Sequence, residues 1–318
     1  MSFRRVHIID TAVGSGNIGD EIIMEACRDA FGPIFEESYV STSAGHDGLG
    51  PSSRKRCRDA DIVMLMGTNA LSPYFRVGLP FMWRVRWRDL RALRGRVVLA
   101  GVGATWDFKR VSPLQKRFWQ YVLSPNHVHS VRDALGEQLV KACGRRVLKT
   151  SCPTLWRYRD TPPTAPTTKA RAVCFTLNRH KRSPIDEDFV RILSDHYEKL
   201  YYWPQTTNDL DYLEPLRSSV KAEVLPPNLA AYDAFLRTHE VDVVGTRLHG
   251  SIRGLNHGRR TLVVSIDNRA REMSHDTGLP TIERDAVPEE LAARLEGQIH
   301  AEIRVKGDTI DEYLSQFG

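Results

Sequence analysis

Hydrophobic residues form short, largely β-branched runs along the chain, separated by longer stretches with amphipathic spacing. The runs that predict strands lie at 6–9, 61–66, 96–100, 128–133, 172–177, 200–203, 241–244 and 261–266. The stretches between them that predict helices include 21–31, 189–200 and 229–239. Strands that alternate with helices are typical of parallel α/β sheets. We therefore predict an α/β protein with two Rossmann-like domains that face each other across a cleft.

The segment 241–266 contains the most informative pattern. Its apolar run ends at Gly245 and Thr246, a helical stretch reaches Gly258, and a second apolar run follows. We predict one βαβ unit with Thr246 as the helix N-cap. Arg247, Leu248 and His249 would then occupy the first helical turn, beyond the carboxyl end of a buried strand, where open α/β sheets bind their ligands.

This turn combines two kinds of chemistry. The free N–H groups of a helix start favour an anion, and an arginine such as Arg247 can donate two parallel hydrogen bonds to phosphate or carboxylate. A histidine such as His249 titrates near neutral pH and can transfer protons. The alternative is a solvated turn without a functional role. We interpret Arg253, His257, Arg259 and Arg260, which follow, as surface charge or as compensation of a helix C-terminus rather than as catalytic groups.

Glycines dominate the first turn of the chain, where Gly14, Gly16 and Gly19 separate a predicted strand from a predicted helix. Such a turn lets the backbone approach a ligand closely, and Asn17 and Asp20 could hydrogen-bond that ligand. It has neither the Gly-Lys-Ser/Thr of a P-loop nor a full dinucleotide-binding pattern. Capping of the following helix is the alternative role for Asp20.

Other predicted strands also end in polar residues. Thr68 and Asn69 follow the second strand, Arg132 lies near the end of a later one, and Asp267 and Arg269 follow the last clear strand. The carboxyl ends of parallel strands share one edge of a sheet, so we predict that these groups line a substrate site together with Asn17, Asp20 and Leu248.

The segment 74–96 mixes aromatic and apolar residues with seven arginines. We predict an amphipathic helix that could lie on an anionic membrane surface, with rings at headgroup level and cations near the lipid phosphates. The alternative is an ordinary helix with its apolar stripe in the core and its arginines in solvent.

The length of 318 residues favours two domains of ordinary size. A segment rich in proline and threonine at 160–168 suits an extended linker. We therefore predict an N-terminal domain over 1–160, a C-terminal domain over 170–290, and terminal helices over 291–318.

Composition narrows the function classes. No apolar run could span a bilayer and the N-terminus has no signal-peptide core, so we expect a cytoplasmic protein. Five cysteines without paired spacing predict neither a zinc site nor a disulfide framework. A net charge of +6 and a pI near 9.1 suit acidic partners. We expect no nucleic-acid partner, because no nucleic-acid-binding motif accompanies the charge.

Three short motifs occur in order along the chain: 16–21 (Gly-Asn-Ile-Gly-Asp-Glu), 130–133 (Ser-Val-Arg-Asp) and 245–250 (Gly-Thr-Arg-Leu-His-Gly). With Asp267 after the following strand, this set resembles the polysaccharide pyruvyl transferase family over about residues 6–280. The resemblance differs at 67–69, where the family has a glycine-rich turn, and at Arg269, where it often has lysine. Arginine keeps the charge of lysine but changes its geometry.

The resemblance implies a glycosyltransferase-B-like fold, with the acceptor bound by the N-terminal domain and the donor by the C-terminal domain. It also implies transfer of the enolpyruvyl unit of phosphoenolpyruvate onto sugar or glycan hydroxyls, giving a pyruvate ketal in polysaccharide biosynthesis. His249 matches the family's acid/base histidine, and Arg247 and Arg132 match arginines that hold the donor. No cofactor or metal is expected, since phosphoenolpyruvate is itself the donor substrate.

Two other functions are compatible with these residues. One is a nucleotide-sugar-dependent glycosyltransferase of the same fold, although no acidic residue is well placed to hold a ribose. The other is a non-catalytic relative that binds a glycan or anchors at a membrane. Phosphate release that depends on a sugar acceptor would separate an enzyme from a binding protein.

Overall fold

The computed structural model describes residues 3–216 and 220–318 and divides the chain into two compact units. Unit 1 contains Met1–Ser15, Ile23–Arg159 and Val305–Gly318, and unit 2 contains Gly16–Ile22 and Asp160–Arg304. The paired strands within each sheet are parallel, which confirms the predicted α/β class. The domain prediction placed the glycine-rich turn in the N-terminal domain, whereas Gly16–Ile22 packs with unit 2.

The sheet of unit 1 has the order β2-β1-β3-β4. Its strands are β1 (Arg4–Asp10), β2 (Ser38–Ala44), β3 (Ile62–Met66) and β4 (Val97–Ala100), and β5 (His129–Val131) with β6 (Val147–Lys149) forms a second small sheet. All residues of β3 and β4 are buried, which explains their continuous apolar sequence. The helices assigned to this region are α1 (Ile18–Ala30, which begins in unit 2), α2 (Gly32–Glu36), α3 (Pro51–Asp59), α4 (Leu90–Leu93), α5 (Pro113–Val122), α6 (Ala134–Ala142) and α13 (Gly307–Ser315).

The C-terminal helix α13 completes the core of unit 1. Ile310, Tyr313 and Phe317 are buried in a cluster with residues of β1, β3 and β4, and the Tyr313 hydroxyl donates to the Leu99 carbonyl at 2.7 Å. The preceding helix, α12 (Val287–Glu296), belongs to unit 2. The two predicted terminal helices are therefore parts of different units.

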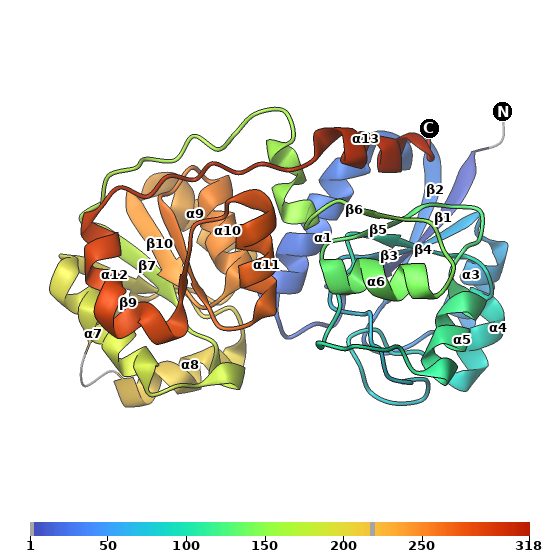
Figure 1. The fold of residues 1–318 in the computed structure, drawn as a ribbon, viewed down its shortest axis with the longest axis horizontal. Helices are drawn as coiled ribbons and strands as arrows, with labels where there is room; N and C mark the ends of the chain where they lie inside the picture. Colours follow the sequence, from blue (N-terminus) through green and yellow to red (C-terminus); the bar gives the residue numbers. More distant parts are fainter. Residues whose placement is uncertain (1–2, 217–219) are drawn as a thin grey trace. The chain divides into compact units, whose positions relative to one another are not determined.

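The sheet of unit 2 has the order β12-β11-β10-β7-β8-β9. Its strands are β7 (Ala172–Thr176), β8 (Lys199–Tyr202), β9 (Ala222–Val224), β10 (Val241–Gly245), β11 (Thr261–Ser265) and β12 (Thr281–Glu283). The helices between them are α7 (Ile185–His196), α8 (Thr207–Leu213), α9 (Leu229–Thr238), α10 (Leu248–Asn256) and α11 (Asn268–Thr277). Figure 1 shows helices on both faces of this sheet. After β7 the chain adds β8 and β9 on one side of the sheet, and after β10 it adds β11 and β12 on the other side. The direction in which strands are added therefore reverses between β7 and β10.

Arg260 was predicted to carry surface charge or to compensate a helix C-terminus, and the surface position was wrong. Its side chain is only 1% exposed and forms an ion pair with Asp242, which also accepts from the Tyr197 hydroxyl at 2.6 Å. The guanidinium donates to the carbonyls of Leu295 and Gly297 at 2.7 and 2.8 Å. Arg260 precedes β11 and links the sheet to the end of α12, because a buried guanidinium needs a partner for each of its donors.

The predicted helix over 74–96 was also wrong. Residues 74–86 are irregular, and only η1 (Trp87–Asp89) and α4 are helical. Gly78 has φ = 85° and donates its N–H to the Val85 carbonyl at 2.8 Å, so the chain turns back on itself. The turn lies beside Pro80, which would interrupt a helix.

None of the described helices is both long and apolar enough to cross a membrane. All five cysteines are buried, and none takes part in a disulfide.

Candidate functional site

Helix α10 begins one residue later than predicted. Thr246 donates its backbone N–H to the Thr176 carbonyl at 3.0 Å and therefore continues the pairing of β10 with β7. The N-cap is Arg247, which has no side-chain cap hydrogen bond, and the helix starts at Leu248. His249 is its second residue and is 7% exposed. The helix start thus lies where the strand order of unit 2 reverses, at the edge where such sheets bind ligands.

The ends of β7 and β10 approach each other very closely here. A Cβ atom on Gly245 would lie 2.1 Å from the Thr176 hydroxyl oxygen and 2.6 Å from the Thr176 carbonyl oxygen. Only glycine fits in this space, and the contact fixes where the chain leaves the sheet toward Arg247 and His249.

Arg247 forms a bidentate ion pair with Asp209, a residue that sequence analysis missed. The Arg247 Nε donates to Asp209 Oδ2 at 2.9 Å, and its Nη2 donates to Asp209 Oδ1 and to the Thr206 hydroxyl. Nε also contacts the Leu177 carbonyl at 3.3 Å. Asp209 is fully buried and accepts the backbone N–H groups of Thr206 and Arg179 as well. Among the hydrogen bonds of the described residues, none involves Arg247 Nη1, so that nitrogen can still donate to a ligand.

Gln205 connects the helix start to the glycine-rich turn. Its Oε1 accepts the Gly250 N–H at 3.0 Å, and its Nε2 donates to Asn17 Oδ1 at 2.8 Å. The Gln205 carbonyl accepts the Ile18 N–H at 3.0 Å. Gln205 is 3% exposed, and a Cβ on Gly19 would lie 2.6 Å from its Nε2. The residue next to His249 is therefore held by the side chain that also holds Asn17.

Two aromatic side chains, Trp203 and Tyr232, contact the first turn of α10 at Gly250. Trp203 stacks on Tyr232 with 3.9 Å between ring centroids and 5° between planes, and the Tyr232 hydroxyl donates to the Gly250 carbonyl at 3.1 Å. A Cβ on Gly250 would lie 3.1 Å from both Gln205 Oε1 and the Trp203 ring. Packing on one side and a hydrogen bond on the other leave the first turn of α10 little freedom.

Asp233 of α9 binds the C-terminal end of α10. It pairs with Arg253 and accepts from His257 Nε2 at 3.0 Å. Burial alone would raise the pKa of Asp233, but the hydrogen bonds from Arg253 and His257 outweigh burial and bring the pKa to about 2. The carboxylate therefore stays charged at neutral pH and holds the C-terminal end of α10 against α9.

Asp267 and Arg269 lie at the end of β11, as the pattern predicted. Asp267 caps α11 by accepting the Arg269 N–H at 3.1 Å, and the Arg269 guanidinium folds back onto the same carboxylate. Lys181 Nζ lies 3.3 Å from Asp267 Oδ2. Burial would raise the pKa of Asp267, but hydrogen bonding and charge from Arg269 and Lys181 lower it well below its usual range. The cation of Arg269 is thus already paired within its own turn.

In unit 1, Arg132 and Asn69 are brought together at the carboxyl ends of β5 and β3. The Arg132 Nη2 donates to Asn69 Oδ1, and the Arg132 side chain is 3% exposed. Its Nη1 is buried and makes no hydrogen bond to the described residues. A Cβ on Gly103 would lie 2.4 Å from Arg132 Nε, so glycine is required for the guanidinium to lie against this backbone and reach Asn69. A buried cationic donor without a partner is costly, and an anionic ligand would satisfy it.

The neighbouring turn after β3 is strained. Thr68 has φ = 59° and follows Gly67 at φ = 60°. A left-handed backbone is unfavourable for a β-branched residue and usually persists only where function or packing demands it. The Thr68 carbonyl accepts the Gly103 N–H at 2.8 Å. The strained turn is therefore hydrogen-bonded to the glycine that lies against the Arg132 guanidinium.

The predicted site residues therefore form two groups. Asn17, Asp20, Arg247, Leu248, His249 and Arg269 belong to unit 2, where Gln205 and Asp209 join them. Asn17 directly precedes α1, and Asp20 lies in the first turn of α1 and is 9% exposed. Thr68, Asn69 and Arg132 belong to unit 1. Among the described residues, no group of three or more His, Cys, Asp or Glu could hold a metal ion.

The sequence around Gln205 and Asp209 contains a recognisable helix-start pattern. Both follow the strand β8, and Thr206 with Asp209 three residues later forms a capping box at the start of α8. The motif predicts a helix start, but it does not show that the carboxylate also binds an arginine 38 residues away.

A comparison with protein-family models finds a match to the model described as polysaccharide pyruvyl transferase over residues 17–268. No curated protein matches the chain. The matched region includes all of these site residues except Arg269.

Solved structures show the fold. The chain is similar to a UDP co-structure of MnaA from S. aureus, with a TM-score of 0.56, 12% identity and coverage of 99% of this chain and 97% of that one. It is also similar to a putative UDP-N-acetylglucosamine 2-epimerase from Listeria monocytogenes, with a TM-score of 0.55, 11% identity and coverage of 99% and 95%. These neighbours are glycosyltransferase-B-like, as the fold prediction stated. At such identities they carry no argument about activity.

The buried Arg247–Asp209 pair generates a stability prediction. Arg247→Met should lower the free energy of unfolding by about 3–5 kcal/mol, because it leaves the Asp209 carboxylate buried without its cation. The double variant Arg247→Met/Asp209→Leu should lose clearly less than the sum of the two single variants. Urea unfolding measures all three. The exposed pair of Arg179 and Asp211 provides the control, since Arg179→Met should cost at most about 1 kcal/mol. Additive losses would show that the buried pair is not coupled.

Proposed function

Because the chain belongs to the polysaccharide pyruvyl transferase family, we propose that it transfers the enolpyruvyl unit of phosphoenolpyruvate onto two hydroxyls of a sugar or glycan. The product is a cyclic pyruvate ketal, and inorganic phosphate is released. The observation that carries the proposal is the first turn of α10, where Arg247 and a nearly buried His249 lie at the strand-order reversal inside the family match.

The reaction requires both an acid and a base. The methylene carbon of phosphoenolpyruvate gains a proton and becomes a methyl group, and the adjacent carbon forms bonds to two sugar oxygens while its bond to the phosphate oxygen breaks. Two hydroxyl protons are released, which balances the proton on the methyl group and the one taken up by phosphate. A single imidazole can act first as the acid and then as the base, so we assign this role to His249.

The donor's charges need stabilisation as they shift during the reaction. The positive end of α10 and the remaining Nη1 donor of Arg247 suit the carboxylate or the departing phosphate. In unit 1, the unpartnered Nη1 of Arg132 offers a further buried donor for an anion. We assign Arg247 mainly to holding the strand-to-helix turn, because Asp209 compensates most of its charge.

The segment 74–96 supports a second, separate proposal. Although it is not a helix, it exposes Tyr74, Leu79, Met82 and Trp87 beside several arginines. We propose that this surface makes peripheral contact with an anionic membrane, where aromatic rings lie at headgroup level and arginines lie near lipid phosphates.

For His249, we expect His249→Ala to reduce turnover about 10²- to 10⁴-fold while leaving phosphoenolpyruvate affinity within a few-fold, because only proton transfer is lost. Phosphate release in the presence of candidate sugars gives turnover, and mass spectrometry of the sugar detects the ketal-linked pyruvate. His275→Ala is the matched control, since that side chain is 89% exposed. Wild-type turnover by His249→Ala would falsify the assigned role.

For Gln205, we expect Gln205→Leu to lower kcat about ten- to a hundredfold with a smaller change in KM, because the first turn of α10 loses its link to Asn17. Gln205→Glu should lower kcat as well, since its carboxylate can accept the Gly250 N–H but cannot donate to Asn17 Oδ1. Steady-state kinetics well below the melting temperature measures both variants. A lower melting temperature with unchanged kcat would reduce Gln205 to a purely structural residue.

For the membrane proposal, flotation with vesicles of phosphatidylcholine and phosphatidylserine should carry a substantial fraction of the protein upward, and neutral phosphatidylcholine vesicles should not. Trp87→Ser combined with Arg88→Ser should abolish flotation, because Trp87 is 64% exposed and Arg88 is also exposed. Recovery of the wild-type protein entirely in the lower fraction would remove this proposal.

A further inference from the structure

Strand β5 leads directly to Arg132 and belongs to a small sheet with β6, beside the edge strand β4 of the four-stranded sheet. The two strands pair through their backbones at Val102, just beyond the end of β4. The Val102 N–H donates to the Ser130 carbonyl at 3.3 Å, and the Val102 carbonyl accepts the Arg132 N–H at 3.2 Å. The position of Arg132 therefore depends on how β5 is held against β4.

Along β4 and the residue after it, two side chains of β5 accept the backbone N–H groups. The Leu99 N–H donates to His129 Nδ1 at 3.3 Å, and the Gly101 N–H donates to Ser130 Oγ at 2.9 Å. In a regular parallel pair, such N–H groups would donate to carbonyls of the neighbouring strand. His129 and Ser130 are both fully buried. Loss of either side chain would therefore leave a buried N–H without a partner, which is costly.

His129 can accept this hydrogen bond in only one protonation state. The Ser124 carbonyl can only accept, so His129 Nε2, which lies 3.0 Å from it, carries the ring proton. Nδ1 then has the lone pair that the Leu99 N–H requires. Burial lowers the pKa of His129 to about 4, although the hydrogen bond to Ser124 acts in the opposite direction. The ring is therefore neutral at neutral pH, and Nδ1 remains an acceptor.

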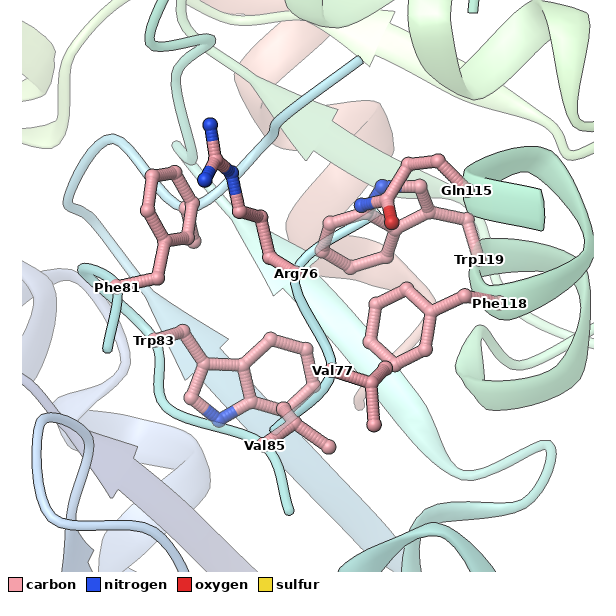
Figure 2. Close-up of a pocket in the computed structure, with 9 residues that line it drawn as sticks. Arg76, Val77, Phe81, Trp83, Val85, Gln115, Phe118 and Trp119 are labelled. Carbon is pink, nitrogen blue, oxygen red and sulfur yellow. The ribbon is translucent and has the colours of Figure 1, made fainter. Parts of the chain in front are cut away.

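The segment that binds the other ring nitrogen is itself well anchored. Ser124 lies just after α5, and its N–H donates to a carbonyl of β4 at 2.9 Å. Figure 2 shows Phe118 and Trp119 of α5 near Trp83, whose ring centroid lies 6.2 and 5.8 Å from theirs. The space among these side chains has room for about one water molecule. His129 thus connects β4 to a helix end that is packed into the core of unit 1.

The Arg132 guanidinium tolerates little movement of β5. It donates to Asn69 Oδ1, and its Nε lies 2.4 Å from the point where a Cβ on Gly103 would be. One residue separates Arg132 from Ser130, whose Oγ is held 2.6 Å from the Thr150 hydroxyl oxygen. A shift of β5 away from β4 would therefore move the guanidinium relative to Asn69 and Gly103.

We propose that His129 and Ser130 are positioning residues for the candidate anion site of unit 1, which Arg132 and Asn69 form. Their side chains take the place of backbone pairing with β4 and so set where the Arg132 guanidinium lies. The proposal gives Ser130 of the 130–133 motif a task that suits a small hydroxyl, which can accept a backbone N–H at close range. It rests on the proposed function in one respect, because Arg132 is assigned there to an anion of the donor.

Matched variants of the full chain separate these roles. His129→Asn places an oxygen near the position of Nδ1 and keeps an acceptor for the Leu99 N–H, whereas His129→Gln places its polar group near Nε2 and loses that acceptor. His129→Gln and Ser130→Ala should raise hydrogen–deuterium exchange in the segment 129–134 about tenfold, and His129→Asn should raise it much less. Ser124→Ala is the control, since it removes a buried hydroxyl that bonds His127 rather than β4.

Calorimetric titration with phosphoenolpyruvate gives the second readout. His129→Gln and Ser130→Ala should weaken its binding about tenfold, as expected for a misplaced charged donor, while His129→Asn and Ser124→Ala stay within about threefold of the wild type. Circular dichroism confirms that each variant is folded. If His129→Gln does not fold, the comparison of Ser130→Ala with Ser124→Ala still decides the question.

Unchanged exchange in 129–134 for both His129→Gln and Ser130→Ala would overturn the inference. Faster exchange with unchanged phosphoenolpyruvate affinity would also overturn it, because both residues would then be purely structural. Equal loss of affinity in His129→Asn and His129→Gln would have the same meaning. Failure of the proposed function differs from these outcomes, since the wild type would then bind no phosphoenolpyruvate while the selective change in exchange persisted and supported the role of the two side chains.

Discussion

The buried ion pair between Arg247 and Asp209 is the interaction on which the candidate site of unit 2 depends. Removing two charges from water is expensive, and the expense is offset only when the geometry is good and the remaining donors and acceptors are satisfied. Asp209 accepts from two backbone N–H groups as well as the guanidinium, and Arg247 also contacts Thr206 and Leu177. The pair therefore joins the ends of β7 and β10 to the start of α8, and the position of His249 follows from it.

The sequence predicted the parts of this arrangement that depend on local patterns. Buried parallel strands have continuous apolar sequences, so β3, β10 and β11 were visible, and the turn with Arg247 and His249 lies after β10 as expected. Asp209 was not predicted, because a carboxylate at the start of a helix has the same local pattern whether or not a distant arginine approaches it. The segment 74–96 was mistaken for a helix, since its apolar spacing resembles an amphipathic stripe and the turn at Gly78 outweighed it.

Both units use glycine in the same way at their candidate sites. Gly245 allows β10 to lie against Thr176, and Gly103 allows the Arg132 guanidinium to reach Asn69. In each case a side chain would occupy the space that a functional group needs, so the absence of a Cβ is a condition for the site geometry. The strained Thr68 beside Asn69 is consistent with this, because its left-handed backbone is maintained by a hydrogen bond from Gly103.

Pairing Arg247 with Asp209 also changes the electrostatics of the helix start. An uncompensated guanidinium two residues from an imidazole would oppose protonation of that ring, as any nearby like charge does. The Asp209 carboxylate cancels most of that field, while the N–H groups at the start of α10 still provide a positive potential that is directed along the helix axis. An anion can therefore be attracted by the backbone N–H groups at the start of α10 without an uncompensated guanidinium beside the histidine. A free arginine would attract the anion more strongly, but it would work against the acid step that the proposed reaction requires.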